Sequence, residues 1–388
     1  MPHHDESGRG RAESRRALPE GQWTLDQICA DFARREARLA AEARRAGVSR
    51  REFLRLLAAG AAAGVAGAAA GQIARAAESD SPPAAEVPQR PPAAPGGEPA
   101  PPAPALALQK SRVVLIKNPE CIIREYRANP LVVRQMIDRA LVALTGKSDE
   151  RAAWGTVGRA GDFIAIKHNS IGWPTLHSHT EINDAVAGQL VALAGCDPKR
   201  ILAVDRILPP EYAEFSDPYT LPTRGLKTRL RRLYVDQATA IVNVSVLKCH
   251  FNLGVSCAMK NHLGSVNNPS AYHGWEAGRL PANVPELNAL EPLRTKTRLC
   301  IVDAVRPLFA GGPADDEQYR WDLYSLILGT DPVAVTAVGI GLLEEKRREV
   351  RGQAWPMTAA RRMVAHGQAI GLGNADPERI DLVRIDVG

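Results

Sequence analysis

Short runs of β-branched and other apolar residues alternate with helical patterns from residue 109 to the end of the chain. Buried strands are expected at residues 112–118, 163–169, 200–207, 240–248, 298–305, 323–330 and 380–387. Helical patterns separate them at residues 130–146, 180–195, 331–346 and 357–373. This alternation predicts one large α/β domain, residues 109–388, whose largely parallel or mixed sheet is covered by helices on both faces.

Residues that begin and end helices stand where these patterns require them. Pro130 suits the first turn of its helix, and Gly146 is placed to end it. Thr180 is the expected N-cap of the next helix. Asp331, followed directly by proline, is most simply the N-cap of the third.

A leader with a different composition precedes the α/β pattern. Arg50 and Arg51 form a pair, an Ala/Gly-rich apolar run follows at residues 56–71, and residues 74–76 read Ala-Arg-Ala. This predicts a twin-arginine export signal over residues 49–76, after an N-terminal extension of residues 1–48. The expected partner is the twin-arginine translocation machinery, and the expected location is the periplasm or cell envelope. An uncleaved signal, associated with the membrane as an N-terminal anchor, is the alternative.

Residues 77–108 are rich in proline and alanine, a composition that cannot form a core. We therefore expect a disordered tether between the signal and the domain. The twin-arginine route carries folded proteins, often ones that acquire a cofactor in the cytoplasm. The signal therefore favours a bound cofactor but does not identify it, and a metal ion is one alternative.

Charge and cysteine spacing narrow the classes of partner. The net charge is +6, but residues 1–76 hold 13 Arg against 9 Asp and Glu, so most of the excess lies in the leader. No basic stripe with interleaved aromatic residues follows, which argues against nucleic acid as a partner. The six cysteines form no C-x-x-C pair, so the chain carries no iron–sulfur cluster motif.

Polar residues gather where the expected strands end. Lys167 and Asn169 follow one strand, Lys248 and His250 follow another, and Asp303 follows a third. Ligands of parallel α/β sheets collect at the carboxyl ends of strands, so we expect these side chains to form one cleft. The alternative is that they are polar because loops are exposed.

The stretch 247–264, LKCHFNLGVSCAMKNHLG, allows two kinds of site. Lys248 and Lys260 could converge on one anion, with Asn261 beside them and backbone N–H groups at the start of a short helix adding donors. A metal would instead use His250 and Cys257, although their spacing matches no strong ligand template. The sequence favours the anion site.

Three further histidines are candidates for chemistry. His177 and His179 would face the same side of an extended chain and could bind a metal together with Cys257. His273 stands in a loop bounded by glycine and is a candidate acid or base, as is His250. The chain has no G-x-G-x-x-G, P-loop, G-x-S-x-G or H-E-x-x-H motif, so nucleotide binding and serine hydrolysis lack support.

The segments GDFIAIKHN, LKCH, AMKNHLG, IVDAV, GGP, DPVAV and GLG, taken in this order across residues 112–387, resemble domain of unknown function family 362 (DUF362). The resemblance implies an α/β domain, which in some relatives is joined to a ferredoxin module that this chain lacks. Its pattern places matching residues at Lys248, His250, Lys260, Asn261, Gly264, His273, Asp303 and Asp331. The chain departs from the pattern at Cys249, where threonine is frequent, and at Thr336, where aspartate is usual.

These observations predict an exported α/β protein, of unestablished reaction, that binds a small anionic ligand, and they leave open whether it is an enzyme. Lys248, Lys260, Asn261, Lys167 and Asn169 would bind the ligand. His250, His273 and Asp303 would carry acid–base or orienting roles. Two alternatives stay open: a metal- or redox-linked binding protein loaded in the cytoplasm and exported folded, and a non-catalytic periplasmic module.

Overall fold

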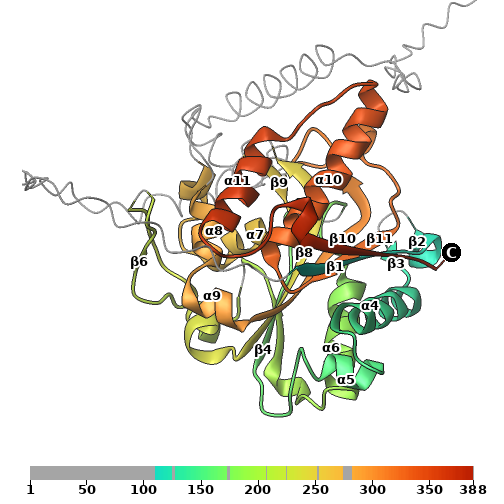
Figure 1. The fold of residues 1–388 in the computed structure, drawn as a ribbon. Helices are drawn as coiled ribbons and strands as arrows, with labels where there is room; N and C mark the ends of the chain where they lie inside the picture. The colour runs from blue at the N-terminus through green and yellow to red at the C-terminus, as the bar shows by residue number, and fades with distance from the viewer. Residues whose placement is uncertain are drawn as a thin grey trace, which may run out of the picture.

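A computed structural model describes residues 110–387, except 125–126, 173–174, 207, 224, 251–252 and 274–281. The predicted N-terminal extension, twin-arginine signal and linker therefore lie outside the described residues. The described part is an α/β unit built on an eight-stranded mixed sheet with helices on both faces (Figure 1). The predicted fold class is confirmed. No described helix combines the length and apolar character needed to cross a membrane.

The main sheet has the strand order β12-β1-β11-β10-β8-β4-β5, and β9 pairs with the outer part of β8. All strands run in one direction except β11 and β9, which are antiparallel to their neighbours. Two-stranded ladders β2–β3 and β6–β7 lie outside it. The strands are β1 (Ser111–Lys117), β2 (Ile122–Arg124), β3 (Arg127–Ala128), β4 (Ile164–Lys167), β5 (Ile201–Val204), β6 (Tyr219–Thr220), β7 (Lys227–Thr228), β8 (Ala240–His250), β9 (Gly254–Ser256), β10 (Thr297–Leu308), β11 (Ser325–Gly329) and β12 (Ile380–Asp386).

The helices form one layer on each face of the sheet (Figure 1). One layer contains α4 (Pro130–Thr145), α5 (Glu150–Trp154) and α6 (Thr180–Ala192). The other contains α7 (Ala258–Asn261), α8 (Asn283–Asn288), α9 (Glu291–Lys296), α10 (Pro332–Arg351) and α11 (Thr358–Ala369). Each layer encloses its own apolar core against the sheet, and alternation along the strands divides the apolar side chains between them. On β4, Ile164 and Ile166 enter the core under α4–α6, whereas Ala165 enters the opposite core.

Several helix ends follow the sequence signals, but α6 ends at Ala192 and α10 at Arg351 rather than at residues 195 and 346. Gly146 ends α4 in the left-handed conformation, and the Asp331 carboxylate accepts hydrogen bonds from the N–H groups of Val333 and Ala334 at the start of α10. The prediction of Thr180 as an N-cap is wrong. Thr180 is the first helical residue of α6, and His179 occupies the cap position without a side-chain cap bond.

The stretch 247–264 also differs from its expected form. β8 runs on to His250, and Gly254–Ser256 returns as the antiparallel strand β9 where only a turn was expected. The helix that follows is the single turn α7, continued by the 3-10 turn His262–Ser265. A helix this short does not provide the N-terminal anion site that the sequence suggested.

Candidate functional site

A buried ion pair joins the carboxyl ends of two neighbouring parallel strands. Lys167 ends β4, Asp205 follows β5, and Lys167 Nζ lies 2.6 Å from Asp205 Oδ1. Ser170 adds two hydrogen bonds to the other carboxylate oxygen, from its backbone N–H at 2.8 Å and from its hydroxyl. Burial raises the pKa of Asp205, but the charge of Lys167 and these hydrogen bonds outweigh it and bring the pKa to about 2. Burial lowers the pKa of Lys167. The short contact with Asp205 nevertheless indicates that both side chains are charged.

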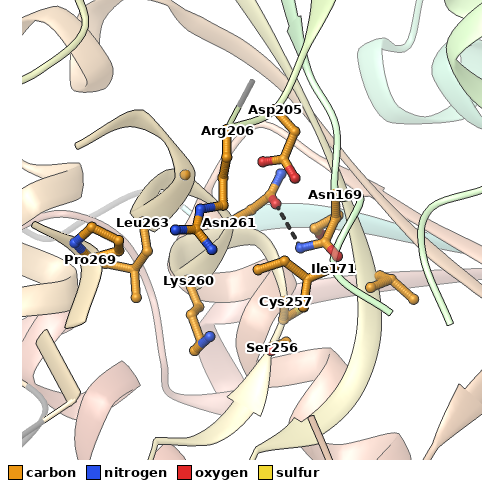
Figure 2. A pocket seen from close by; sticks show the side chains of 13 residues that line it. Asn169, Ile171, Asp205, Arg206, Ser256, Cys257, Lys260, Asn261, Leu263 and Pro269 are labelled. Atoms are coloured by element: carbon orange, nitrogen blue, oxygen red, sulfur yellow. Dashed lines mark hydrogen bonds between the residues drawn. The ribbon is translucent and has the colours of Figure 1, made fainter. Parts of the chain in front are cut away.

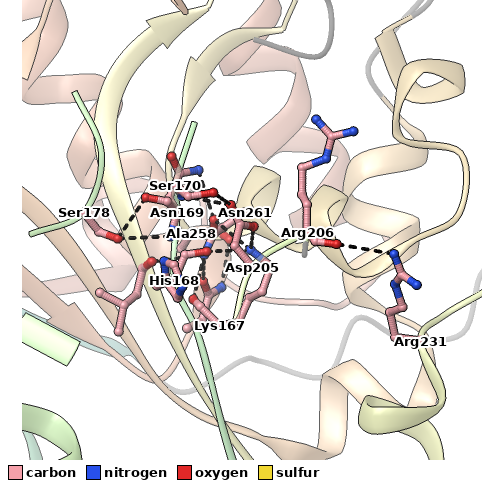
Figure 3. A network of polar contacts seen from close by, with 12 residues as sticks. Lys167, His168, Asn169, Ser170, Ser178, Asp205, Arg206, Arg231, Ala258 and Asn261 are labelled. Carbon is pink, nitrogen blue, oxygen red and sulfur yellow. Dashed lines mark hydrogen bonds and ion pairs between the residues drawn. The ribbon is translucent and has the colours of Figure 1, made fainter. Parts of the chain in front are cut away.

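Asn261, on α7, connects β4, β8 and the loop after β4 through its side-chain amide (Figure 3). Its Nδ2 donates to Asn243 Oδ1 on β8 at 2.7 Å, to the Lys167 carbonyl at 3.0 Å and to the Val244 carbonyl at 3.2 Å. Its Oδ1 accepts from Asn169 Nδ2 at 3.2 Å. Because the amide is buried and its donors and acceptor are used, Asn261 fixes the position of α7 on the sheet.

Lys248 is buried on β8 and binds the loop after β4. Its Nζ donates to the Ile171 carbonyl at 2.6 Å, to the Leu176 carbonyl at 3.0 Å and to Asn169 Oδ1 at 3.5 Å. Burial is the main cause that lowers its pKa from 10.5 to about 7, and the charge of Asp205 offsets this only in part. These hydrogen bonds from the Lys248 amine fix the conformation of the loop that carries Asn169.

Gly264 allows α7 and its 3-10 extension to approach the ion pair closely. A Cβ atom at this position would stand 2.6 Å from Asp205 Oδ1 and 2.8 Å from Lys167 Nζ. Real Cβ atoms do not approach other atoms so closely. Close packing against the ion pair therefore explains why residue 264 is a glycine.

A small pocket opens between α7, β8 and the ends of β4 and β5. Its volume is about 30 Å³, which is enough to admit water or a small chemical group. In Figure 2, Arg206 and Lys260 lie on one side of it, and Asn169, Ile171 and Asp205 on the other. The lining residues are Asn169, Ile171, Asp205, Arg206, Ser245, Val246, Ser256, Cys257, Lys260, Asn261, Leu263, Gly264 and Pro269.

Lys260 is the half-buried cation of this pocket. No described residue accepts a hydrogen bond from its Nζ or pairs with it as a carboxylate. Burial is the first cause that lowers its pKa, to about 7, and the positive charges of Lys248, Arg206 and Lys167 lower it further. The pocket therefore holds an amine in an environment that disfavours its charge.

Asp303 and His179 form a second buried pair on the opposite face of the sheet. Ile301 and Val305 flank Asp303 on β10 and enter the core under α4–α6, which places Asp303 on that side. Asp303 Oδ2 lies 2.6 Å from His179 Nδ1 and accepts the His179 backbone N–H at 2.8 Å. Burial lowers the pKa of His179, but the carboxylate outweighs it, and the pKa lies above its usual value.

The structure brings some of the predicted residues together and separates others. Lys167, Asn169, Lys248 and Asn261 form one hydrogen-bonded group, with Lys260 beside it at the pocket. Asp303 does not line that pocket. His250 is buried at the end of β8 and does not line it either.

The remaining predicted site residues are His273 and the candidate metal ligands His177, His179 and Cys257. The backbone of His273 ends the 3-10 turn Pro269–His273, but its side chain lies outside what the structure describes. His177 Nδ1 donates to the Ser178 carbonyl, 2.7 Å away, and the ring centroid of His177 is 6.2 Å from that of His179. Cys257 is buried at the pocket. Within the described ranges, no three His, Cys, Asp or Glu side chains group as metal ligands.

Sequence reasoning missed three residues of the site: Asp205, Arg206 and Asn243. Asp205 and Arg206 directly follow β5, so the rule that selected Lys167 and Lys248 applies to them equally. Asn243 lies within a strand of otherwise apolar character, and a buried amide there signals a specific partner.

Comparison with known proteins gives one match. No curated protein and no solved structure matches the chain. Residues 213–341, a shorter range than the sequence resemblance suggested, match the family model described as Domain of unknown function (DUF362). This range carries Lys248, Lys260, Asn261 and Asp303, whereas Lys167 and Asp205 precede it. The match supports the assignment of this part of the chain to the DUF362 domain family.

Proposed function

We propose that this protein binds a small anionic ligand in the pocket between α7 and the ends of β4, β5 and β8, with Lys260 and Arg206 as its cationic contacts. The observation that carries the proposal is Lys260. Its amine has no acidic partner among the described residues, while Lys248, Arg206 and Lys167 all act on it as like charges. A bound anion would relieve this repulsion.

The charge of the pocket lining supports the same conclusion. Among the described residues that line it, Asp205 is the one carboxylate, and it is held by Lys167 and Ser170. Lys260 and Arg206 are the two cations that line the same small space. Asn169 and Ser256 add polar groups of the kind that fix the orientation of a bound anion.

Size narrows the ligand class. A volume of about 30 Å³ admits the charged group of a ligand and not a large ligand body. A flat carboxylate fits such a space better than a tetrahedral phosphoryl group. We therefore infer a small carboxylic acid as the preferred ligand.

Thermal unfolding in the presence of anions tests this proposal. Acetate and oxalate should raise the melting temperature at constant ionic strength, relative to chloride, and phosphate should raise it less. Lys260→Met should abolish the rise. Lys147→Met, which alters an exposed lysine beyond the end of α4, should keep it. Equal shifts in all three proteins, or no shift with any anion, would contradict the proposal.

The small volume also favours a second candidate, a non-catalytic binding module. The two candidates differ in the fate of the ligand. NMR spectra of a carboxylic acid that stabilises the protein, recorded before and after prolonged incubation, separate them. An unchanged ligand supports the module, and conversion to a product supports an enzyme.

We further propose that the protein is exported folded by the twin-arginine route, because Arg50 and Arg51 precede an apolar run and a small-x-small site. Replacement of both arginines by lysine should retain the chain in the cytoplasm, as cell fractionation can measure. Equal export of both proteins would contradict this route.

A further inference from the structure

The amine of Lys260 stands on a rigidly fixed segment of backbone. Met259 N–H donates to Thr336 Oγ1 at 3.3 Å, and Asn288 Nδ2 donates to the Met259 carbonyl at 2.9 Å. On the other side, Asn261 is held by its bonds to β4 and β8. The residues before and after Lys260 are therefore anchored, while its own side chain is left to face the pocket. Such anchoring is what a reacting group needs to be positioned for chemistry.

The surroundings of this amine suit nucleophilic attack rather than permanent ion pairing. A lysine attacks a carbonyl only as the neutral amine, which is scarce at pH 7 for an ordinary lysine. Burial first, and then the charges of Lys248, Arg206 and Lys167, lower the pKa of Lys260 to about 7. Desolvation and neighbouring cations are the two means by which proteins activate a lysine in this way.

We propose that Lys260 forms an imine with a small 2-oxo acid, whose carboxylate is bound beside Arg206 in the same pocket. The proposal rests on the proposed function, because it assigns the carboxylate to the same anion site. It adds the substrate class, an α-keto carboxylate, and a covalent role for one residue.

The step balances without an oxidant or a reductant. The Nζ lone pair attacks the carbonyl carbon, the C=O π electrons move to oxygen, and the oxygen takes a proton to give a carbinolamine. Nitrogen then loses a proton, the C–O bond breaks, and water leaves as the C=N bond forms. Addition of water reverses the sequence.

Reductive trapping tests the inference on the full chain. Pyruvate with cyanoborohydride at pH 7 should label Lys260 at least about tenfold more than the exposed Lys147, as peptide mass spectrometry can quantify, because burial and the neighbouring cations increase the neutral fraction of Lys260. Propanal, which has no carboxylate, should show a smaller preference for Lys260. Lys260→Met should remove this label and leave that of Lys147. Arg206→Gln should weaken labelling of Lys260 by pyruvate more than by propanal, because it removes the contact to the carboxylate as well as one charge that lowers the pKa of Lys260.

The outcomes separate this inference from the proposed function. Stabilisation by acetate with no preferred labelling of Lys260 overturns the imine and leaves anion binding in place. Absence of both overturns both. Equal preference with pyruvate and propanal overturns the 2-oxo acid as the substrate class.

Discussion

Lys167 and Asp205 form an ion pair of 2.6 Å that ties the ends of β4 and β5 together while both side chains are almost completely buried. The pair is surrounded by hydrogen bonds from Ser170 and by the amide of Asn261. The pair thus fixes the strand ends that carry pocket side chains. Its two charges neutralise each other and are not available to a ligand.

Lys167→Met should lower the free energy of unfolding by about 3–5 kcal/mol, because Asp205 would remain buried without its partner. The double variant Lys167→Met with Asp205→Asn should recover part of the loss, since the unpaired charge is removed. Urea denaturation measures both. A single variant as stable as wild type would show that the pair is dispensable.

Gly264→Ala should destabilise the protein by about 1–3 kcal/mol, because the added Cβ meets Asp205 and Lys167. Gly188→Ala is the matched control. It lies within α6 with nothing within 4 Å of the added atom, so alanine there should stabilise the helix. Thermal unfolding of the two variants should therefore shift in opposite directions.

Lys248 should give the stability a distinct pH dependence. Its pKa is about 7 in the folded protein, against 10.5 for an ordinary lysine. As the pH rises from 7 toward 10.5, the unfolded chain holds this proton longer than the folded one, so the free energy of unfolding increases. Below pH 7 both states are protonated, and the cost of burial is fully present.

Comparison of wild type with Lys248→Met isolates this effect. The buried thiols, such as Cys257, titrate in the opposite sense but are common to both proteins. Urea denaturation at pH 7 and about pH 9.5 should show a smaller rise in the variant. An identical pH dependence would mean that Lys248 keeps an ordinary pKa.

Asp303→Asn should lower the pKa of His179, because burial would then act without the opposing carboxylate. The pair's contribution to stability through His179 is complete below the unfolded pKa of 6.5 and is lost as the pH rises through the raised folded pKa. Titration of the His179 ring by NMR measures the shift. Asp184→Asn, an exposed change on α6, should leave it unaltered.

The sequence was sufficient to predict the α/β class and the principal strands and helices, because periodicity and caps act locally. It could not predict that β11 enters antiparallel between β1 and β10, since strand order depends on packing between distant segments. It also could not assign Lys260 to the pocket edge and Asp303 to the opposite face. Asp303 lies on β10, where one register position decides which face of the sheet a side chain occupies, and the position of Lys260 depends on how α7 packs on the sheet.

The polar group itself was predictable only in part. Lys167, Asn169 and Lys248 lie at or near strand ends and do meet, with Asn261 of α7 between them. The counter-ion Asp205 was overlooked although the same rule applies to it. The separation of His250 from the pocket follows from the length of β8, and no local pattern reveals that length.

The pairing of β12 with β1 has a consequence for the order of events during synthesis. Seven register pairs join Ser111–Lys117 to Ile380–Asp386, across almost the whole described chain. Until the ribosome has released residues 380–386, β1 has an open edge that any extended segment could occupy. Completion of the sheet must therefore wait for the synthesis of β12, and a chain cut short before β12 would present that edge to its neighbours and aggregate.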